Sequence, residues 1–577
     1  MLNIDSLNNC LNCKNAGCEN SCILHTNIKE LISLVKQNKI VDAVSLQYQY
    51  NSIPFVCGKL CDHERGCFGG CNNKKSKVNT YELCYELGKL RLDLPVNKKD
   101  KKGKHIVIIG GGVAGLIAAE LLLEEGFEVS LYEKNKALGG VLSSTMPDFR
   151  YDMTIFNKWI DRLYKLGLKV YLNYEVKVLS ELGNYDYLVV ATGAGIAKKL
   201  YSDDLTVDAL KLLEQYKDNS LELKNKNVIV LGGGNTAYDV ARVINHLGNN
   251  VSIAYRRDIK NSPAAVNEIN LAIKEGVNVL ECLAPKEITK KDNKYVITFN
   301  KTMLVDDGSS RLNFKILNEE VIVNCDLIVE AIGANSDLKF LKENFPALIN
   351  EKGYVSDIEN NNIYVIGDAY SGAASFVKAN LTARQCVKCI IEKESKKVLF
   401  GGSFNPPTIA HLKIIEYLSK HFDEVLLLPN GDQYSFDGKV LNSFNHRVNM
   451  LDLMCKNLKN VKILDLENSD EFMGTYHTLR LLNHPTFVLG ADCLDKLHMW
   501  KHFDELITEN TFILFNRNNK NLKEEILSNI HLKNHLDKFN IINEEIPNVS
   551  SSEYRNTKNK EIITKEVYEY IRENELY

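Results

Sequence analysis

Apolar runs, glycine-rich turns and helical stretches alternate through the middle of the chain. An apolar run at residues 106–109 leads into a glycine cluster, and residues 116–123 continue with the spacing of a helix. Residues 227–231 begin a second unit of this kind, and residues 397–400 begin a third. Buried strands that alternate with helices are typical of parallel sheets with helices on both faces. The pattern therefore predicts a multidomain α/β protein.

The first unit has the spacing of a dinucleotide-binding turn. Gly110, Gly112 and Gly115 follow the strand as G-x-G-x-x-G. The first glycine permits a tight turn, the second lets a pyrophosphate approach the backbone, and the third lets helix and strand touch. Glu133 closes the next strand, close to the roughly 20-residue spacing of the carboxylate that binds the adenosine ribose. We therefore predict a Rossmann-like domain that binds a dinucleotide.

The second unit repeats the turn with the opposite charge after its second strand. Gly232, Gly234 and Ala237 give G-x-G-x-x-A. Arg256 and Arg257 stand where the first unit has its acid. A carboxylate would repel a 2′-phosphate, whereas guanidinium groups bind one with paired hydrogen bonds. We therefore expect FAD in the first unit and NADPH in the second; the alternative is a surface arginine pair without a ligand.

Composition and charge exclude several classes of partner. The 577 residues are 45% hydrophobic and carry a formal net charge of −3, so the overall charge does not attract nucleic acid or anionic lipid. No apolar run reaches the roughly 18 residues of a membrane helix, and the polar N-terminus lacks a signal-peptide pattern. We therefore expect a cytoplasmic protein that binds small molecules, no nucleic acid and no membrane.

Nine of the fifteen cysteines lie before residue 85, most of them in two groups. The first group reads C-x2-C-x4-C-x3-C from Cys10, and the second reads C-x3-C-x5-C-x3-C from Cys57. In a large cytosolic chain, clustered thiols indicate metal binding rather than disulfides. Their spacing alone leaves zinc ions and iron–sulfur clusters open. The redox-type nucleotide units that follow favour iron–sulfur clusters, which carry single electrons next to a flavin.

This pattern, with the phrase PFVCGKLCDHERGC, resembles the N-terminal domain of glutamate synthase small subunits and of dihydropyrimidine dehydrogenase. The resemblance implies two 4Fe-4S clusters that share ligands between the two groups. One would be held by Cys10, Cys13, Cys18 and Cys71. The other would be held by Cys22, Cys61, Cys67 and an eighth ligand, which is a Gln or Glu in the family. Cys84 falls at that place, so we predict it as a ligand and Cys57 as a bystander; alternatively, Cys84 is a small buried hydrophobic residue.

The middle of the chain resembles flavoproteins with two dinucleotide domains. Residues 191–193 (ATG) and 331–333 (AIG) stand at the two crossovers, and a later strand-like segment ends in Gly367 and Asp368. The resemblance implies that Gly367 and Asp368 face the ribityl chain and phosphate of FAD. The next helix has Thr382 where the family usually has glycine. The implied chemistry is hydride transfer from NADPH to FAD, followed by single-electron transfer through the clusters to an unidentified acceptor, such as another protein.

Residues 396–577 resemble nicotinate and nicotinamide mononucleotide adenylyltransferases. The segment GGSFNPPTIAH has the family's G-x-F-x-P followed by [H/T]-x-x-H at the start of a helix. The resemblance implies that ATP phosphates lie along Gly401, Gly402, Ser403 and Phe404. His411 would contact the α-phosphate, and Thr408 replaces the commoner first histidine. Positioning and electrostatics suffice for this transfer, so no protein nucleophile is required.

Three later segments match the same family in order. They carry Lys439 and Arg447 for a substrate loop and helix, Gly490, Asp492 and Trp500 for the ribose and ring, and Ser551, Ser552 and Arg555 for the leaving phosphates. His411, Thr408 and Arg555 are the predicted catalytic residues. ATP chemistry implies Mg²⁺, although no carboxylate cage is evident. Nicotinate mononucleotide (NaMN) and nicotinamide mononucleotide (NMN) both stay open as substrates, and a nucleotidyltransferase acting on phosphopantetheine is the alternative.

Four domains follow from these patterns: a helical double 4Fe-4S domain (1–100), an FAD domain (101–206 with 330–395), a nested NADPH domain (207–329) and a Rossmann-like adenylyltransferase domain (396–577). The predicted function is bifunctional. An adenylyltransferase makes deamido-NAD and pyrophosphate from ATP and NaMN in NAD biosynthesis, and it is fused to an NADPH-dependent FAD/iron–sulfur oxidoreductase. Two alternatives remain: the first part is a redox-sensing regulator of the transferase, or the chain is an electron-transfer subunit of a larger complex.

Overall fold

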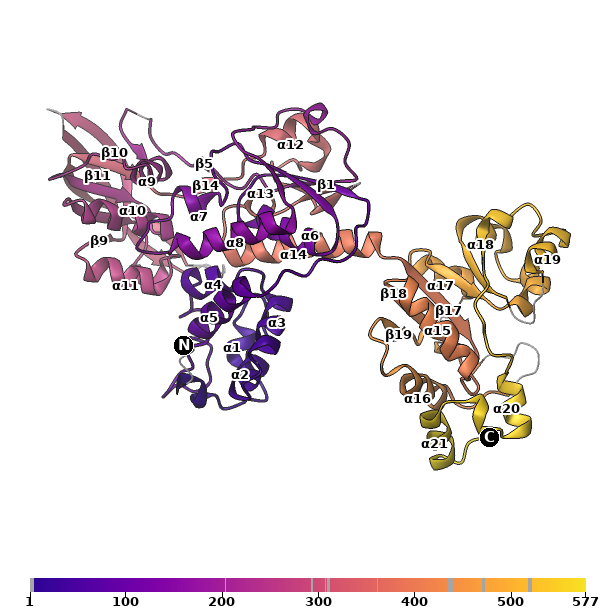
Figure 1. The fold of residues 1–577 in the computed structure, drawn as a ribbon. Helices are drawn as coiled ribbons and strands as arrows, with labels where there is room; N and C mark the ends of the chain where they lie inside the picture. Colours follow the sequence, from indigo (N-terminus) through magenta and orange to yellow (C-terminus); the bar gives the residue numbers. More distant parts are fainter. Residues whose placement is uncertain are drawn as a thin grey trace. The chain divides into compact units, whose positions relative to one another are not determined.

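The computed structural model describes residues 5–202, 204–291, 294–306, 308, 312–360, 362–433, 440–469, 473–516 and 521–577. The chain is a multidomain α/β protein with parallel sheets, and it divides into two compact units, Met1–Ile391 and Glu392–Tyr577 (Figure 1). Within the described ranges, no helix is long and apolar enough to span a bilayer.

The cysteine-rich start of the chain is helical. Its helices are α1 (Gly17–Asn20), α2 (Ile28–Lys36), α3 (Ile40–Tyr50), α4 (Pro54–Leu60) and α5 (Thr80–Asp93). Apolar residues at helical spacing predict α2 and α3, and these helices share a small core with α5 that includes Leu31, Val35, Ala43 and Leu87. This region therefore has a core of its own, which includes Cys71 and contacts Cys10, Cys18 and Cys67.

A six-stranded sheet follows, and its strand order is β15-β16-β4-β1-β2-β3. The strands are β1 (His105–Ile109), β2 (Glu128–Tyr132), β3 (Lys169–Tyr171), β4 (Tyr187–Val190), β15 (Glu359–Asn360) and β16 (Ile363–Val365), all parallel except β15. The helices α6 (Val113–Glu124), α8 (Met153–Leu166) and α14 (Phe376–Glu394) contribute to one core, and α12 (Lys339–Asn344) contributes to another. Because β15 and β16 come from much later in the chain than β4, another domain is inserted into this sheet.

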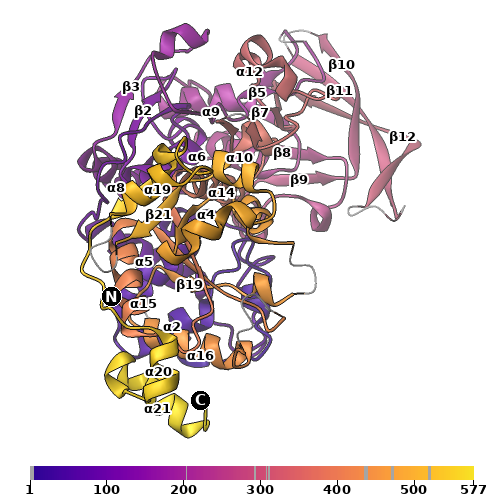
Figure 2. The same ribbon diagram turned by 90° about the vertical axis from the view of Figure 1, so that its right-hand side faces the viewer.

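The inserted part has a parallel sheet of order β6-β13-β7-β8-β9 and an antiparallel sheet β10-β11-β12 (Figure 2). The strands are β6 (Val207–Asp208), β7 (Asn227–Leu231), β8 (Asn250–Tyr255), β9 (Asn278–Glu281), β10 (Leu283–Lys291), β11 (Lys294–Val305), β12 (Asn313–Cys325) and β13 (Leu327–Glu330). The helices are α9 (Ala209–Lys217), α10 (Asn235–His246) and α11 (Val266–Lys274). The two crossovers pair through β5 (Ile196–Ala197) and β14 (Ala334–Asn335).

The second unit is built on one parallel sheet of order β19-β18-β17-β20-β21-β22. The strands are β17 (Lys397–Gly402), β18 (Glu424–Pro429), β19 (Val461–Ile463), β20 (Thr486–Leu489), β21 (Phe512–Phe515) and β22 (Phe539–Ile542). One core includes α15 (Ile409–His421), α16 (Phe444–Cys455) and α21 (Lys565–Glu573); the other includes α17 (Thr475–Leu481), α18 (Phe503–Glu509) and α19 (Leu522–Ser528). The order reverses between β17 and β20, which is where ligands bind in such sheets.

Candidate functional site

The first glycine turn lies between β1 and α6, and its three glycines have three different geometries. Gly110 has φ +108°, and a β-carbon there would lie 2.3 Å from the carbonyl oxygen of Ala191. A β-carbon on Gly115 would lie 2.1 Å from the carbonyl oxygen of Gly110. At Gly112, by contrast, a β-carbon would have no atom within 4 Å. Side chains are therefore excluded at Gly110 and Gly115, while the space beside Gly112 is open, as the binding of a pyrophosphate requires.

Polar groups surround this turn. Glu133 is buried directly after β2, where one carboxylate oxygen accepts the N–H of Gly111 at 2.7 Å and the other accepts the N–H of Asn135 at 2.8 Å. Gly367 follows β16, and a β-carbon there would lie 2.8 Å from the Cβ of Ala114 in α6. The structure thus brings Glu133 and Gly367 to the same turn from opposite sides of β1, and both fit a bound dinucleotide.

Asp368 and Thr382 lie at the same edge. Burial raises the pKa of Asp368 to about 6, and its carboxylate accepts the N–H of Ala374 at 3.2 Å. Thr382, which replaces the family's glycine, accepts the N–H of Gly367 on its hydroxyl oxygen at 2.9 Å. The threonine therefore holds the backbone of Gly367 and connects it to α14.

The second glycine turn, between β7 and α10, repeats the first. Gly232 has φ +145°, and a β-carbon there would lie 2.3 Å from the carbonyl oxygen of Ala331. Gly234 has open space at that position, and Ala237 is fully buried. The two turns therefore have the same shape although they differ in their third small residue.

Arg256 and Arg257 follow β8, and the hairpin of β11 and β12 lies against them. The ring of Phe314 is 5.0 Å from the guanidinium carbon of Arg256 and 5.4 Å from that of Arg257. Arg257 also donates from Nε to the carbonyl oxygen of Leu312 at 2.8 Å. Sequence reasoning missed Phe314, because no local pattern connects this hairpin to the arginines.

The eight predicted cysteine ligands fall into two neighbourhoods. One small pocket is lined by several residues, among them Cys10, Cys13, Cys18 and Cys71. These four come from both sequence motifs, and burial raises the pKa of Cys18 to about 12. Such a thiol becomes a thiolate only with a metal or another source of positive charge. The pocket therefore fits a soft metal centre.

The remaining cysteines lie around α4 and α5. A hydrogen bond that Cys61 donates to Cys57 raises the pKa of Cys61, and burial and repulsion from Cys57, Cys84 and Cys67 add to this. Burial raises the pKa of Cys84, with repulsion from Cys57, Cys67 and Cys22 adding to it. Among the described residues, no three His, Cys, Asp or Glu side chains meet at a position for a single metal ion. The second neighbourhood holds Cys22, Cys61, Cys67 and Cys84, with Cys57 beside them.

In the second unit, the turn after β17 leads to His411 in the first turn of α15. Nδ1 of His411 accepts the backbone N–H of Thr408 at 3.0 Å and lies 2.8 Å from the hydroxyl oxygen of Thr408. Because the backbone nitrogen can only donate, neutral His411 carries its proton on Nε2. The ring of Phe404 lies with its centroid 5.1 Å from the imidazole. Thr408 and His411 thus form the N-terminal cap of α15, and the contact with the backbone of Thr408 fixes the tautomer of neutral His411.

Side chains from distant segments hold the backbone of the same turn. Arg447 is fully buried and donates to the carbonyl oxygen of Ser403 at 3.1 Å and to that of Asn442 at 2.8 Å. Arg555 donates to the carbonyl oxygen of Asn405 at 2.6 Å. Ser551 donates to the carbonyl oxygen of Pro406 at 2.8 Å. Three predicted residues on two distant segments therefore converge on residues 403–406.

Further groups complete this turn. Asn405 is 1% exposed and accepts the backbone N–H of Asn442 at 3.1 Å and the hydroxyl of Tyr577 at 2.6 Å. Arg555 also donates to the hydroxyl oxygen of Ser552 at 2.9 Å. Sequence reasoning missed Asn405 and Tyr577, although Asn405 lies inside the quoted segment.

The other predicted substrate residues, apart from Lys439, come after β20 in the chain. Gly490 follows that strand, and Trp500 packs on Phe487 with ring centroids 6.2 Å apart. A β-carbon on Gly401 would lie 3.3 Å from the Phe487 ring, so Trp500 is joined to the end of β17 through one aromatic side chain. Asp492 lies in the 3-10 helix Ala491–Met499, and Lys439 lies outside the described residues.

Comparison with protein families gives three separate matches. Residues 3–87 match dihydropyrimidine dehydrogenase domain II with its 4Fe-4S cluster, and residues 104–383 match pyridine nucleotide-disulphide oxidoreductases. Residues 399–557 match cytidylyltransferase-like proteins. Along the chain, these three matches fall on the helical cysteine region, the two nested sheets and the second unit, in that order.

Individual relatives match one half to two thirds of the chain. AegA of Escherichia coli (strain K12) is 30% identical over 426 residues, which is 66% of this chain and 64% of AegA. YgfK of Escherichia coli O157:H7 is 28% identical, and the chain spans 39% of it. The glutamate synthase (NADPH) small chain of Halomonas elongata is 28% identical over 66% of this chain and 89% of its own length. The solved structure of Mycobacterium tuberculosis FprA with NADPH is 19% identical over 50% of this chain and 84% of FprA, with a TM-score of 0.44.

The chain therefore joins a 4Fe-4S domain, Rossmann-like FAD/NAD(P) oxidoreductase domains and a cytidylyltransferase-like nucleotidyltransferase domain. Its oxidoreductase part has homologues among glutamate synthase small chains.

Proposed function

We propose that the chain is a bifunctional enzyme that oxidises NADPH in its first unit and transfers an adenylyl group from ATP to NaMN in its second. The proposal divides the chain at residues 100, 206, 329 and 395, so that residues 207–329 bind NADPH and residues 101–206 with 330–395 bind FAD. The electron acceptor is either a further protein or a small molecule. The redox half of the proposal rests on the two glycine turns. They have the same geometry, but the next strand is followed by Glu133 in one unit and by Arg256 and Arg257 in the other.

In the redox half, FAD would lie on the first glycine turn and NADPH on the second. Glu133 is buried beneath the first turn, so its carboxylate is held where an adenosine ribose would meet it. Gly367 and Asp368 would hold the ribityl chain and phosphate. When bound, FAD would supply the chemistry that links a two-electron donor, NADPH, to one-electron acceptors such as 4Fe-4S clusters.

Arg256 and Arg257 would bind the 2′-phosphate of NADPH. Phe314 lies close to both guanidinium groups and limits their freedom, which lowers the entropy lost when a phosphate binds. Removing both arginines should raise the KM for NADPH at least tenfold and leave the KM for NADH nearly unchanged, because a phosphate contact of this kind contributes about 1.5–3 kcal/mol. A wild-type preference for NADH would contradict the assignment.

Two 4Fe-4S clusters would be held by the two cysteine neighbourhoods. Cys10, Cys13, Cys18 and Cys71 line one pocket, and we assign Cys22, Cys61, Cys67 and Cys84 to the second cluster. Iron and sulfide analysis of anaerobically purified protein tests the number of clusters. Cys84→Ala should alter the electron paramagnetic resonance spectrum of one cluster only, while Cys57→Ala should leave both spectra unchanged.

In the transferase half, an oxygen of the NaMN phosphate attacks the α-phosphorus of ATP, the bond to the β-phosphate breaks, and pyrophosphate leaves. Nε2–H of His411 would donate to the α-phosphate, while the N-terminus of α15 adds positive potential. Arg555 and Ser552 would contact the leaving phosphates. Mg²⁺ would accompany ATP and neutralise part of its charge.

The observation that carries the transferase half is the orientation of His411, whose proton is fixed on Nε2 by the N–H of Thr408. Trp500 near the end of β17 supports a pyridine nucleotide as the acceptor, because an indole ring can stack on the pyridine ring. Pyrophosphate release is the test, with ATP and either NaMN, NMN or phosphopantetheine. The proposal expects turnover with NaMN; turnover with phosphopantetheine alone would replace it.

A further inference from the structure

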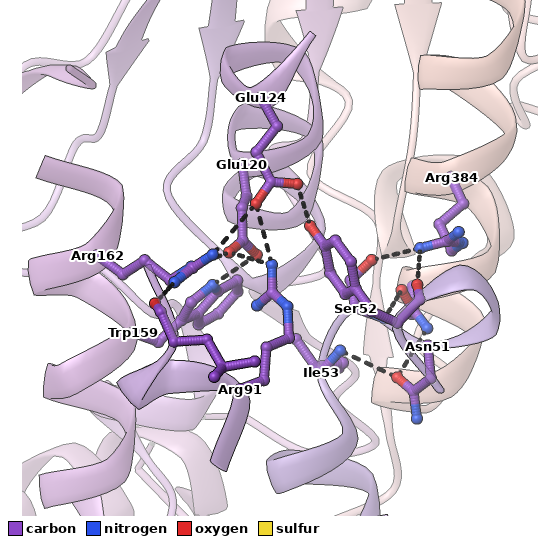
Figure 3. A network of polar contacts seen from close by, with 12 residues as sticks. Asn51, Ser52, Ile53, Arg91, Glu120, Glu124, Trp159, Arg162 and Arg384 are labelled. Atoms are coloured by element: carbon purple, nitrogen blue, oxygen red, sulfur yellow. Dashed lines mark hydrogen bonds and ion pairs between the residues drawn. The ribbon is translucent and has the colours of Figure 1, made fainter. Parts of the chain in front are cut away.

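A buried polar network joins the cysteine-rich region to the helices α6, α8 and α14 (Figure 3). Its ionic part links Arg91 of α5 to Glu120 and Glu124 of α6, at 2.8 and 3.2 Å. Glu120 is fully buried and also accepts the indole N–H of Trp159 at 2.9 Å. Removing one member of such a set leaves an unpaired buried charge, which is strongly destabilising. The ion pairs therefore hold the two regions in one arrangement.

A second part of the network runs from Asn380 in α14 to Asn51, and both side chains are buried. The side-chain oxygen of Asn51 accepts the N–H of Ile53 at 3.0 Å and the amide of Asn380 at 3.1 Å. The side-chain oxygen of Asn380 accepts the N–H of Ser52 at 3.4 Å. Because backbone nitrogens only donate, these contacts assign the oxygen and nitrogen of both amides.

This assignment directs the amide nitrogen of Asn51 toward sulfur. Nδ2 of Asn51 donates to the sulfur of Cys84 at 3.9 Å, and the thiol of Cys57 lies 3.7 Å from the oxygen of Asn51. At its other end the chain of contacts reaches α14, whose Thr382 accepts the N–H of Gly367. One buried asparagine therefore stands between the predicted flavin edge and the second cysteine neighbourhood.

We propose that Asn51 is a positioning residue that fixes Cys84 against α14 and donates a hydrogen bond favouring the reduced state of the metal centre that Cys84 holds. The inference rests on the proposed function, in which Cys84 is a ligand. Hydrogen bonds to ligand sulfurs stabilise added negative charge and so raise the reduction potential. Asn51 touches neither substrate nor flavin; it acts through Cys84.

Asn51→Asp in the full-length protein removes the donor and adds a carboxylate, and both changes disfavour the reduced state of the cluster. The carboxylate keeps the acceptor contacts to Ile53, Asn380 and Cys57 but turns an oxygen toward the sulfur of Cys84. We expect unchanged iron content and unchanged bleaching of the flavin by NADPH. The reduction equilibrium of one cluster should shift about tenfold toward the oxidised form, the size expected for a hydrogen bond to a charged group. Redox titration followed by electron paramagnetic resonance measures the shift.

Ser52→Ala is the matched control, because it lies beside Asn51 and removes only the hydroxyl that accepts from Arg384 at 2.8 Å. We expect wild-type potentials for it. If Asn51→Asp loses iron, Asn380→Ala takes its place, and a smaller shift in the same direction is expected because Asn51 then keeps its bond to Ile53. An unshifted signal in an iron-replete variant, or an equal shift in Ser52→Ala, overturns the inference.

Cys84→Ala distinguishes a failure of this inference from a failure of the assignment of Cys84 as a cluster ligand. If Cys84→Ala leaves iron content and both spectra unchanged, the ligand assignment fails, and the role of Asn51 fails with it. If Cys84→Ala changes one spectrum while Asn51→Asp changes none, the ligand assignment stands and only the positioning role is refuted.

Discussion

The glycine turn at residues 110–115 and the turn at residues 401–408 both lie where a parallel strand meets a helix, but they are held differently. The first depends on absent side chains: a β-carbon at Gly110 or Gly115 would collide with a carbonyl oxygen. The second depends on side chains that are present, since Arg447, Arg555 and Ser551 each donate to its backbone carbonyl oxygens. A phosphate-binding backbone can therefore be shaped by removing atoms locally or by supporting it from afar.

Substitutions should affect the two turns in different ways. A glycine turn has a few positions where any side chain is excluded and one where a side chain would displace the ligand. A supported turn tolerates local change better, but each supporting residue contributes part of its shape. We therefore expect sharp, position-specific losses in the first unit and graded losses in the second.

The largest effect is expected at Gly110. Gly110→Ala places a β-carbon 2.3 Å from the carbonyl oxygen of Ala191 at φ +108°, which should destabilise the fold by about 2–5 kcal/mol from backbone strain and overpacking. Gly112→Ala meets no atom within 4 Å, so its fold should persist while flavin is lost. Thermal unfolding and the flavin absorbance of purified protein check both. Equal losses of stability in the two variants would refute the distinction.

The next effect concerns chemistry rather than shape. His411→Ala removes the Nε2 donor and should lower kcat for pyrophosphate release by about 10²–10³, as loss of one transition-state donor does. NADPH oxidation should be unchanged. His421→Ala, at the exposed end of the same helix, is the control and should retain wild-type transfer. A fall of less than tenfold for His411→Ala would remove it from the catalytic residues.

A smaller effect is expected at Arg447, because the turn keeps its other supports. Arg447→Met leaves the partly buried carbonyl oxygens of Ser403 and Asn442 without this donor, at a cost of about 2–4 kcal/mol. The temperature that inactivates the transferase should fall, and the KM for ATP should rise more than kcat falls. Arg447→Lys should recover part of both, since it keeps the charge but not the fork geometry. Inactivation of the NADPH oxidase activity should stay at its original temperature.

The same contrast explains what could be predicted from sequence. The glycine spacing, Glu133 and the alternation of strands and helices are local patterns, and the structure gives the predicted elements β1, α6, β7 and α10. The contact between Asn51 and Asn380 spans 329 residues, and that between Asn405 and Tyr577 spans 172. Periodicity cannot signal such pairs. The supports of the 401–408 turn were recoverable only where a family motif carried them, as with Arg447 and Arg555.

The smallest effect is expected at Tyr577, whose hydroxyl donates to the side-chain oxygen of Asn405 at 2.6 Å. Tyr577→Phe removes this one bond, and Asn405 still accepts the backbone N–H of Asn442 at 3.1 Å. A neutral hydrogen bond contributes about 0.5–1.5 kcal/mol, so the KM for ATP should rise about two- to tenfold with kcat nearly unchanged. Tyr570→Phe loses bonds to His446 and Asn449 on the α16 side of this unit and should leave the KM for ATP unaltered. Asn405 is buried, and Tyr577 is its only long-range hydroxyl donor among the described residues. A KM for ATP that is unchanged in Tyr577→Phe would therefore mean that Arg447, Arg555 and Ser551 alone maintain the shape of the turn. The graded losses expected in this unit would then be limited to substitutions of those three residues.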